Sequence, residues 1–388
     1  MVSFKIYRSI SEIDREVWAS ANIDNDYFKS YGFLKIVEES NIENSQFWYF
    51  LFLFENRIIG AAVLSSFNVA LELFLDEKGK SLVYGIRKIF PNFLNIGFLF
   101  CGIPVSIGKE TLLIIDAGFT GHIITILVRE MKRIAIENKI PVLDFKEYFL
   151  NHKYEMKYVT ESGFIRTWSL PYMSMKITWD SFDEYLHSMR HSYRRQILKQ
   201  MIKTDFSDFG INQDGLLKDC ARIVYGSNKN FSPGLFFSLY SQVMDNAVVV
   251  LERLNLKFFE NLLKDNEKIE IISIKKEDEI LGSALLVKEN KKLVFILVGF
   301  NYEYREKYYV YFNLIYGIIA YAIRNKYELL DMGQTSNYAK ARVGAQGAPM
   351  VTYISSTKKV LVFLLRIFNK VMFPETKLRN YNVFKVKY

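Results

Sequence analysis

A dense run of polar residues follows a short apolar segment in the last quarter of the chain. The apolar segment, ELLDM at 328–332, is typical of a buried strand and contains Asp331. Polar clusters on loops that a sheet supports are typical of binding sites, and Gly333 lets the backbone pass close to a ligand. This loop is our first candidate site, and its members are Gly333, Gln334, Thr335, Ser336, Asn337, Tyr338, Lys340 and Arg342, with Gly344 and Gly347 before Pro349.

A second candidate is the basic segment SFDEYLHSMRHSYRRQILKQMIKTDF at 181–206. Its apolar residues recur at steps of three and four, which predicts one helix over 181–205. No acidic residue lies between Leu186 and Lys203. Cations without carboxylates favour a phosphate-rich ligand or RNA, although a solvated basic face has the same composition. The cations are Arg190, Arg194, Arg195, Lys199 and Lys203.

Other kinds of catalytic centre lack support. His187 and His191 have a spacing that can bind zinc, but no nearby Glu or Cys completes a ligand set, so we expect no metal. Cys101 and Cys220 lie far apart and have no identifiable His partner, which disfavours a disulfide framework and a thiol nucleophile. The sequence also contains no P-loop and no nucleophile elbow.

The elements that must position these residues occur twice. AIENKIPVLD at 135–144 and AIRNKYELLD at 322–331 match at six of ten positions, and both end in Asp. FENRIIGAAVL at 54–64 and KEDEILGSALL at 276–286 form a second pair, and each predicts a hairpin. Both halves therefore have the order hairpin, further strand, long helix and strand, which predicts a mixed α/β domain in tandem.

The two halves differ after the shared Asp. The expected helices at 121–139 and 309–327 both end near an Asn, a residue that tolerates the left-handed conformation of helix ends. Asp144 is followed by FKEYFLNHKY, which has no glycine, whereas Asp331 is followed by the polar loop. The first half is therefore expected to act as a scaffold, and the second half to carry the site.

Composition limits the class of protein. The chain has 388 residues, 50% of them hydrophobic, which is enough for two globular domains, expected at 1–178 and 179–357 with an extension at 358–388. The net charge of +9 suits an anionic partner. We see no signal peptide and expect a cytoplasmic protein. The basic, apolar stretch 358–373 is either a peripheral membrane contact or a terminal helix packed on the body.

The duplicated order resembles two fused acyltransferase domains of the GNAT type. EYLHSMRHSYRRQILKQ at 184–200 resembles the Tyr-Leu…Arg-x-Ile-x-Lys segment of Fem-type and related tandem GNAT proteins. LLDMGQTSNYAKARVGAQGAP at 329–349 resembles their Leu-Asp-x-Gly…Lys…Gly-Ala segment. GFNYEYREKYYVYFNLIYGIIAYAI at 299–323 resembles the region where GNAT proteins hold a cofactor. The resemblance covers about residues 1–355.

The resemblance implies an N-acyltransferase. GNAT proteins move an acyl group from a coenzyme A thioester to an amine, and Fem-type proteins move an aminoacyl group from tRNA to a peptidoglycan precursor. We therefore expect acyl-CoA, or another phosphopantetheine thioester, as the donor, and an amino acid, amino sugar or peptide amine as the acceptor. Acyl carrier protein and aminoacyl-tRNA are the alternative partners. The expected cofactor-binding residues are Arg190, Arg194, Arg195, Arg305, Lys307 and Tyr309.

Acyl transfer to an amine requires a base and a group that protonates the leaving atom. On the resemblance, Asp331 is the candidate base, and Tyr338 or Tyr311 the candidate acid, with Tyr309 not separable from them by spacing. A structural role for Asp331, such as capping or a buried hydrogen bond, is favoured over the catalytic one, because Asp144 shares its repeat position although the flanking residues differ. The expected substrate-binding residues are Gly333, Gln334, Ser336 and Lys340.

One departure from the GNAT pattern keeps other functions open. The glycine-rich loop that usually cradles a pyrophosphate is missing before the helix at 309–327, and DAGFTGH at 116–122 matches it poorly. A tRNA-dependent aminoacyltransferase is the alternative within the enzymes. A non-catalytic RNA- or membrane-binding protein on a GNAT fold is the alternative from another class.

Overall fold

A computed structural model describes residues 1–70, 85–86, 88, 94–152, 156–226, 231–247, 250–264, 267–379 and 381–385. The chain forms two compact units, and each is discontinuous in sequence. The first unit comprises Met1–Leu170, Val248–Leu254 and Pro349–Thr376, and the second comprises Pro171–Ala247, Asn255–Ala348 and Lys377–Tyr388. The expected boundaries 1–178, 179–357 and 358–388 stay a prediction.

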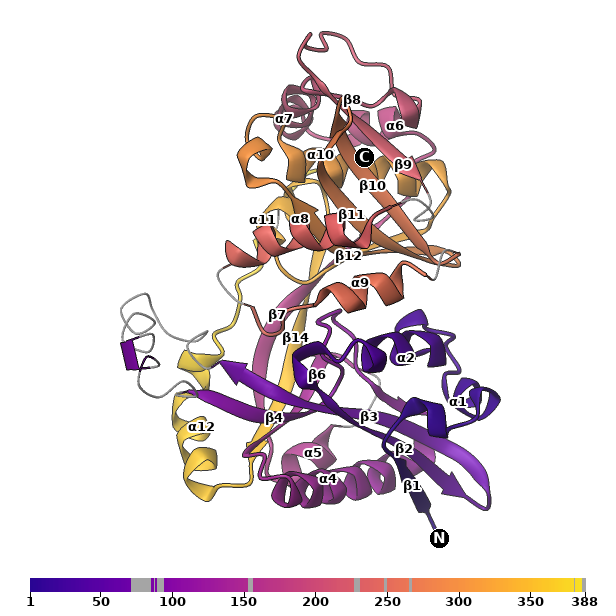
Figure 1. The fold of residues 1–388 in the computed structure, drawn as a ribbon, viewed down its shortest axis with the longest axis vertical. Coiled ribbons are helices and arrows are strands. Elements are labelled where there is room, and N and C mark those ends of the chain that lie inside the picture. Colours follow the sequence, from indigo (N-terminus) through magenta and orange to yellow (C-terminus); the bar gives the residue numbers. More distant parts are fainter. Residues whose placement is uncertain are drawn as a thin grey trace. The chain divides into compact units, whose positions relative to one another are not determined.

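The first unit is a mixed sheet with helices packed against it (Figure 1). Its strand order is β1-β2-β3-β4-β6-β14, and β5 also pairs with β3. Its core is rich in aromatic and branched side chains from the sheet and from α4. The elements are β1 Ser3–Tyr7, α1 Arg15–Ala21, α2 Tyr31–Glu39, β2 Gln46–Phe54, β3 Arg57–Ala70, β4 Asn95–Cys101, β5 Leu112–Ile114, α4 Thr120–Glu137, β6 Val142–Phe149, α5 Lys157–Glu161, β14 Gln346–Ser356 and α12 Lys359–Met372.

The second unit repeats this plan. Its strand order is β7-β13-β12-β11-β10-β9-β8, and the buried helix α10 packs on β10, β11 and β12. The strand β7 pairs antiparallel with β13, as β14 does with β6 in the first unit. The elements that lie wholly or partly in it are β7 Ile165–Lys176, whose first half belongs to the first unit, α6 Phe182–Ser188, α7 His191–Met201, β8 Thr204–Asp205, β9 Ala221–Gly226, α8 Pro233–Asp245, α9 Leu256–Leu262, β10 Ile269–Lys276, β11 Glu279–Glu289, β12 Lys292–Phe300, α10 Val310–Arg324, β13 Leu329–Gly333 and α11 Asn337–Arg342.

Both expected hairpins are confirmed, and they share an irregularity. The register shifts after the Phe52–Gly60 pair in β2 and β3, and after the Ile274–Gly282 pair in β10 and β11. A Cβ on Gly60 would lie 2.9 Å from Ile123 of α4, and a Cβ on Gly282 would lie 2.5 Å from Val310 of α10. The repeated glycine therefore lets the long helix of each unit approach its hairpin closely.

The two long helices end in the same way, although not as the sequence predicted. Asn138 and Asn325 have negative φ, and the left-handed residues are the next ones, Lys139 and Lys326. Each Asn side chain instead donates to the carbonyl four residues earlier, at 2.8 and 2.9 Å. The backbone amides of Ile140 and Tyr327 donate to the carbonyls of Ala135 and Ala322, at 2.8 and 3.0 Å. This completes a Schellman motif in both copies.

The single helix predicted over 181–205 is wrong. The segment forms two helices, α6 and α7, separated by Met189 and Arg190 in extended conformation. The break occurs because the C-terminal segment pairs with the backbone here: Arg190 donates its amide to Val383 at 2.8 Å, and Lys385 donates to Ser188 at 2.8 Å. The apolar residues that recur at steps of three and four pack into the core, as predicted. Leu186, Met189, Ile197 and Met201 are buried, and Tyr193 is half-buried.

The uncharged apolar stretch 89–108 consists, over its described part, of β4 and the irregular segment that follows it, and residues 89–93 lie outside the described residues. Within the described ranges, no helix is both long and apolar enough to span a bilayer.

Candidate active site

The polar loop after β13 has an unusual backbone. Gly333, Thr335 and Ser336 all have positive φ, at 64°, 63° and 49°. A β-branched residue such as Thr335 rarely adopts this conformation, and such strain persists only where surrounding contacts hold it. The loop leads directly into α11, which carries Lys340 and Arg342.

Among the described cations of the second unit, Lys340 has the pKa that departs furthest from its ordinary value. Its side chain is almost fully buried, and Nζ donates to the backbone carbonyls of Met332 and Gln334, the latter at 2.7 Å. Burial lowers the pKa of Lys340 to about 7, while the charge of Asp331 acts in the opposite direction. The side chain therefore holds the loop in place and can exchange a proton near neutral pH.

Asp331 is buried on β13, and both of its carboxylate oxygens accept hydrogen bonds. The hydroxyl of Tyr172 on β7 donates to Oδ2, and the amide of Gly333 donates to Oδ1 at 3.1 Å. These bonds fix the carboxylate where the strand turns into the loop. They fit a structural role for Asp331, and its role as a catalytic base stays a prediction.

Tyr311 and Ser336, which lie far apart in the sequence, meet beside the loop. Burial raises the pKa of Tyr311 to about 12, and a hydrogen bond with Ser336 partly offsets this rise. Asn337 follows Ser336, and its buried Oδ1 has no hydrogen-bond partner among the described residues. Tyr338, by contrast, is 56% exposed and accepts from Arg342 at 2.5 Å. The structure thus places Tyr311 deeper beside the loop than Tyr338.

Arg342 connects the polar loop with the basic segment. Its guanidinium donates to the side-chain carbonyl of Gln196 on α7 and lies 5.9 Å from the ring centre of Tyr193. A cavity of about 10 Å³, enough for one water, lies at this junction of α7, α10 and α11. The polar loop and the basic segment, whose relative position the sequence could not predict, are therefore adjacent.

The cations of α7 differ in their surroundings. Arg194 is half-buried, whereas Arg195 and Lys199 are exposed, and none of the three forms an ion pair within the described ranges. Lys203 stacks on the ring of Tyr309 at 4.7 Å, which joins the end of the basic segment to the start of α10. Arg190 instead lies against the C-terminal segment, with Nε 3.4 Å from the carbonyl of Phe384.

Arg305 and Lys307, which the sequence assigned to the cofactor, already have acidic neighbours. Arg305 pairs with Glu306 at 2.9 Å. Lys307 pairs with Asp219 at 3.2 Å, and Asp219 also binds Lys276. An anionic ligand at this helix start would compete with these carboxylates, so α7 offers the better cationic surface.

Gly344 and Gly347, expected to border the loop, serve packing. A Cβ on Gly344 would lie 2.3 Å from the ring of Phe384, and one on Gly347 would lie 2.5 Å from Leu378. Both glycines make room for the C-terminal segment of the second unit.

The first unit also contains buried ionisable residues around Asp144, and of these the sequence did not single out Lys146 or Glu147. Asp144 accepts from the hydroxyl of Thr352, and burial raises its pKa to about 7. Glu147 follows on the same strand with φ +67°, and burial raises its pKa to about 7 as well. Lys146 lies 3.8 Å from Glu147. The alternation of charged and aromatic residues in FKEYF was the available signal, since a buried strand rarely carries such charges.

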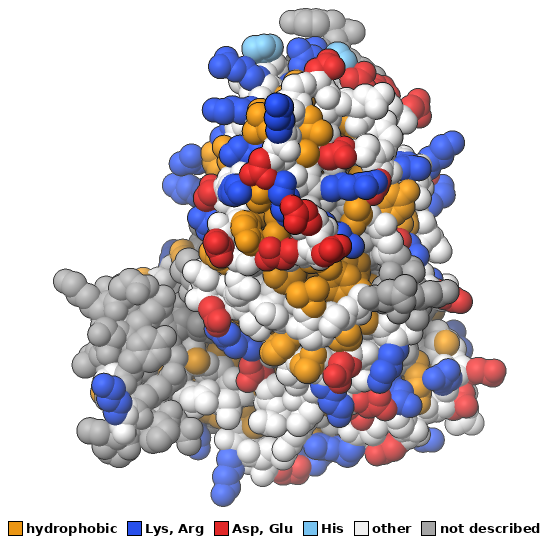
Figure 2. Space-filling model, turned by 45° about the horizontal axis from the view of Figure 1, so that its top comes forward, with side chains coloured by type: hydrophobic (Ala, Val, Ile, Leu, Met, Phe, Trp, Pro, Cys, Tyr) orange, Lys and Arg blue, Asp and Glu red, His pale blue; other side chains and the backbone are white. Residues whose placement is uncertain are grey.

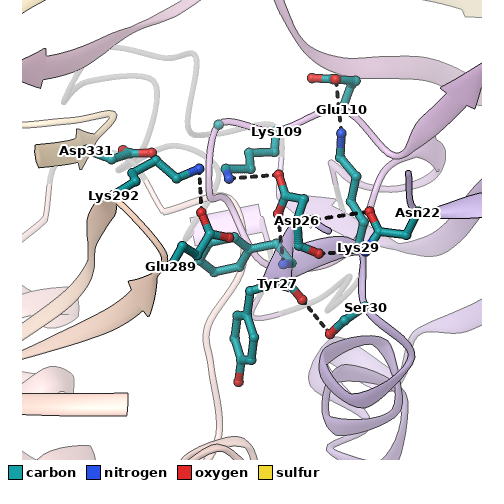
Figure 3. A network of polar contacts seen from close by, with 12 residues as sticks. Asn22, Asp26, Tyr27, Lys29, Ser30, Lys109, Glu110, Glu289, Lys292 and Asp331 are labelled. Carbon is teal, nitrogen blue, oxygen red and sulfur yellow. Dashed lines mark hydrogen bonds and ion pairs between the residues drawn. The ribbon is translucent and has the colours of Figure 1, made fainter. Parts of the chain in front are cut away.

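The loop before β5 closes this polar region. Glu147 accepts from the amides of Gly108 and Lys109, both at 3.2 Å, and Glu252 accepts from the hydroxyl of Ser106 at 3.1 Å. Figure 3 shows Lys109 reaching Asp26, which it binds at 2.9 Å. The described residues include no group of three or more His, Cys, Asp or Glu side chains arranged to hold a metal ion.

Comparison with known proteins agrees with this architecture. Residues 99–356 match the model of the FemAB-like family, described as peptidoglycan biosynthesis/recognition. Among curated proteins, none matches this sequence significantly. The crystal structure of FemX is similar with a TM-score of 0.52 at 12% identity, over 95% of this chain and 100% of that one.

A tandem GNAT protein from the clavulanic acid biosynthesis pathway, solved without acetyl-CoA, has a TM-score of 0.53 at 8% identity, over 92% of this chain and 99% of that one. At these identities the two structures establish the fold. They confirm the expected mixed α/β class and the tandem GNAT-like plan.

Proposed function

This chain belongs to the FemAB-like family, and we propose that it transfers an acyl group from a phosphate-bearing donor to an amine. The preferred donor is acyl-CoA or another phosphopantetheine thioester. The acceptor is the amine of an amino acid, amino sugar or peptide, a class that includes peptidoglycan precursors. The second unit carries the reaction, with the polar loop as its centre.

The buried Lys340 is the observation that carries this proposal. A neutral lysine amine has two N–H groups and one lone pair. Both N–H groups have partners here, in the carbonyls of Met332 and Gln334, so the neutral form keeps its lone pair for a proton. With a pKa of about 7, Lys340 can accept a proton at neutral pH, which is the requirement for a general base.

The chemical steps then follow. The acceptor nitrogen bonds to the thioester carbonyl carbon, Lys340 takes the proton that the nitrogen loses, and the C–S bond breaks. The sulfur leaves as a thiolate and needs no strong acid, because an ordinary thiol has a pKa of about 8.5. Asp331 positions the loop and raises the pKa of Lys340 against burial. Tyr311 and Ser336 border the reacting atoms.

The cations of α7 provide the donor-binding surface. Arg194, Arg195 and Lys199 lack ion-pair partners among the described residues, and Arg342 ties their helix to α11. In the face of the molecule that Figure 2 shows, Lys and Arg side chains are mixed with Asp and Glu instead of forming one continuous patch. A few local cations suit one pyrophosphate better than a long nucleic acid.

Aminoacyl transfer from tRNA is the second candidate, and membership of the FemAB-like family favours it. A ribose leaving group is much more basic than a thiolate. It therefore requires an acid, and Tyr311, with a pKa of about 12, is the residue beside the loop that fits this need.

A two-arm transfer assay tests the proposal. The purified protein is incubated with a panel of acyl-CoA thioesters and amines while thiol release is followed, and in parallel with labelled aminoacyl-tRNA and the same amines. Amine-dependent thiol release supports the first candidate, and transfer of label supports the second. If neither arm reacts while the protein binds RNA or vesicles, the enzymatic function is wrong.

A further inference from the structure

The terminal helix α12 packs on the first unit with one side only. Leu365 is buried against a small cluster on the sheet, which Met372 and Phe373 border. This contact fixes the helix on the unit, as the packed-helix reading of 358–373 expected. The cluster comprises Phe67, Val69, Phe98, Phe100, Val142 and Ile354.

The other side of α12 exposes an apolar surface. Six large apolar side chains are exposed, with Val360 at 70%, Phe363 at 62% and Val371 at 78% as the highest fractions. At 3.6 residues per turn all six fall within an arc of about 140°. No other helix in the described ranges exposes more than one such side chain. The remaining members of this apolar arc are Leu364, Ile367 and Phe368.

Cations border the apolar arc. Lys359, Arg366 and Lys370 project along one edge of it, and Lys358 precedes the helix. The stretch 358–373 contains no Asp or Glu. An apolar arc of aromatic and branched side chains with a Lys- and Arg-rich border is the pattern of helices that lie in the interface of an anionic bilayer.

We propose that α12 docks the first unit on anionic phospholipid membranes, with the apolar arc among the acyl chains and the cations at the headgroups. The helix would lie parallel to the membrane plane, since its inner side stays on the sheet. Pairing with a second copy of the same helix fits less well, because it would bring two sets of unpaired cations together. This inference does not rest on the proposed acyl transfer.

Vesicle sedimentation tests the docking surface. The whole protein is mixed with vesicles of phosphatidylcholine alone or of phosphatidylcholine with phosphatidylglycerol. We expect binding to the anionic vesicles that weakens as salt is added. The variants Phe363→Ser and Phe368→Ser should each weaken binding by about tenfold or more, because each removes a ring from the acyl chains. Arg366→Gln and Lys370→Gln should each weaken it by about fivefold.

Ile136→Ser is the matched control, because Ile136 is 67% exposed on α4 of the same unit and lies outside the arc. It should bind vesicles like the unmodified protein. Unchanged binding by the two Phe variants, or equal binding to both kinds of vesicle, overturns the proposal. So does a concentration-dependent dimer that Phe363→Ser abolishes in the absence of vesicle binding.

Discussion

Asp144 and Asp331 occupy the same position in the two units and bind the same kind of partner. Asp144 lies opposite Ile354, and its hydroxyl donor Thr352 is two residues before that partner. Asp331 lies opposite Ser174, and its donor Tyr172 is again two residues before. Both units have this contact, although only the second has the polar loop. The carboxylate therefore has a structural role that does not depend on the loop.

Removing the hydroxyl partner of either Asp should therefore destabilise the protein. Tyr172→Phe and Thr352→Val each leave a buried carboxylate oxygen without this donor, which costs about 1–3 kcal/mol. Urea unfolding measures the loss. For Tyr172→Phe, an unchanged unfolding free energy with abolished transfer would assign Asp331 to catalysis instead.

Lys340 should give the transfer reaction its pH dependence. Because the base must be neutral, kcat/KM should rise with pH and level off above an apparent pKa near 7. Lys340→Met should remove most activity and the rise itself, by about 100-fold or more in rate. Lys326→Met at the end of α10 is the control and should leave the profile unchanged. A profile in Lys340→Met that keeps the rise would exclude Lys340 as the base.

Stability should depend on pH with opposite signs on the two sides of neutrality. Asp144 and Glu147 have pKa values raised to about 7, so the folded protein binds more protons than the unfolded chain from about pH 4 to 7, and the free energy of unfolding falls with rising pH. Lys340 has a pKa lowered to about 7, so the unfolded chain binds more protons from about pH 7 to 10, and this contribution rises with pH.

Urea unfolding across this range checks both slopes, each at most about 1.4 kcal/mol per pH unit for one group. Glu147→Gln should flatten the acid-side slope and leave the alkaline one, and Lys340→Met should do the reverse. Identical profiles for the two variants would contradict the assignment.

The glycine at the hairpin bulge should be intolerant of a side chain. In Gly282→Ala the new methyl meets Val310 at 2.5 Å and Phe300 at 2.8 Å, and we expect a loss of about 1–3 kcal/mol. Gly32→Ala in α2 is the control, because nothing lies within 4 Å there and a helix favours Ala by about 0.5–1 kcal/mol. Thermal unfolding of both variants should therefore shift in opposite directions.

The cations of α7 should act on donor binding. Arg194→Gln with Arg195→Gln should raise the KM for the donor with little effect on kcat, since these contacts form before the transition state. Arg305→Gln should change KM less, because Arg305 already pairs with Glu306. An equal or larger effect from Arg305→Gln would move the donor site to the start of α10. A steep dependence on salt would favour tRNA over a thioester.

The sequence by itself determined the duplicated plan, because hairpin signals, helical periodicity and the repeated Asn-Lys helix end are local properties. It also determined that the polar residues gather after the second Asp. It could not determine that 181–205 breaks at Met189, because the cause is a backbone contact with Val383, almost two hundred residues away. Long-range contacts of this kind leave no local pattern.

Only the tertiary structure decided which ionisable side chains are buried and have shifted pKa values. The sequence marked Lys340 as a candidate substrate-binding residue, but it did not show that the side chain is buried and that burial lowers its pKa to about 7. Asp144 and Glu147 look like part of a charged strand end in the sequence, and burial in the first unit raises the pKa of both to about 7. Burial acts to lower the pKa of Lys146, but the neighbouring carboxylates raise it on balance. A pKa depends on the distance to water and to other charges, which the order of residues does not specify.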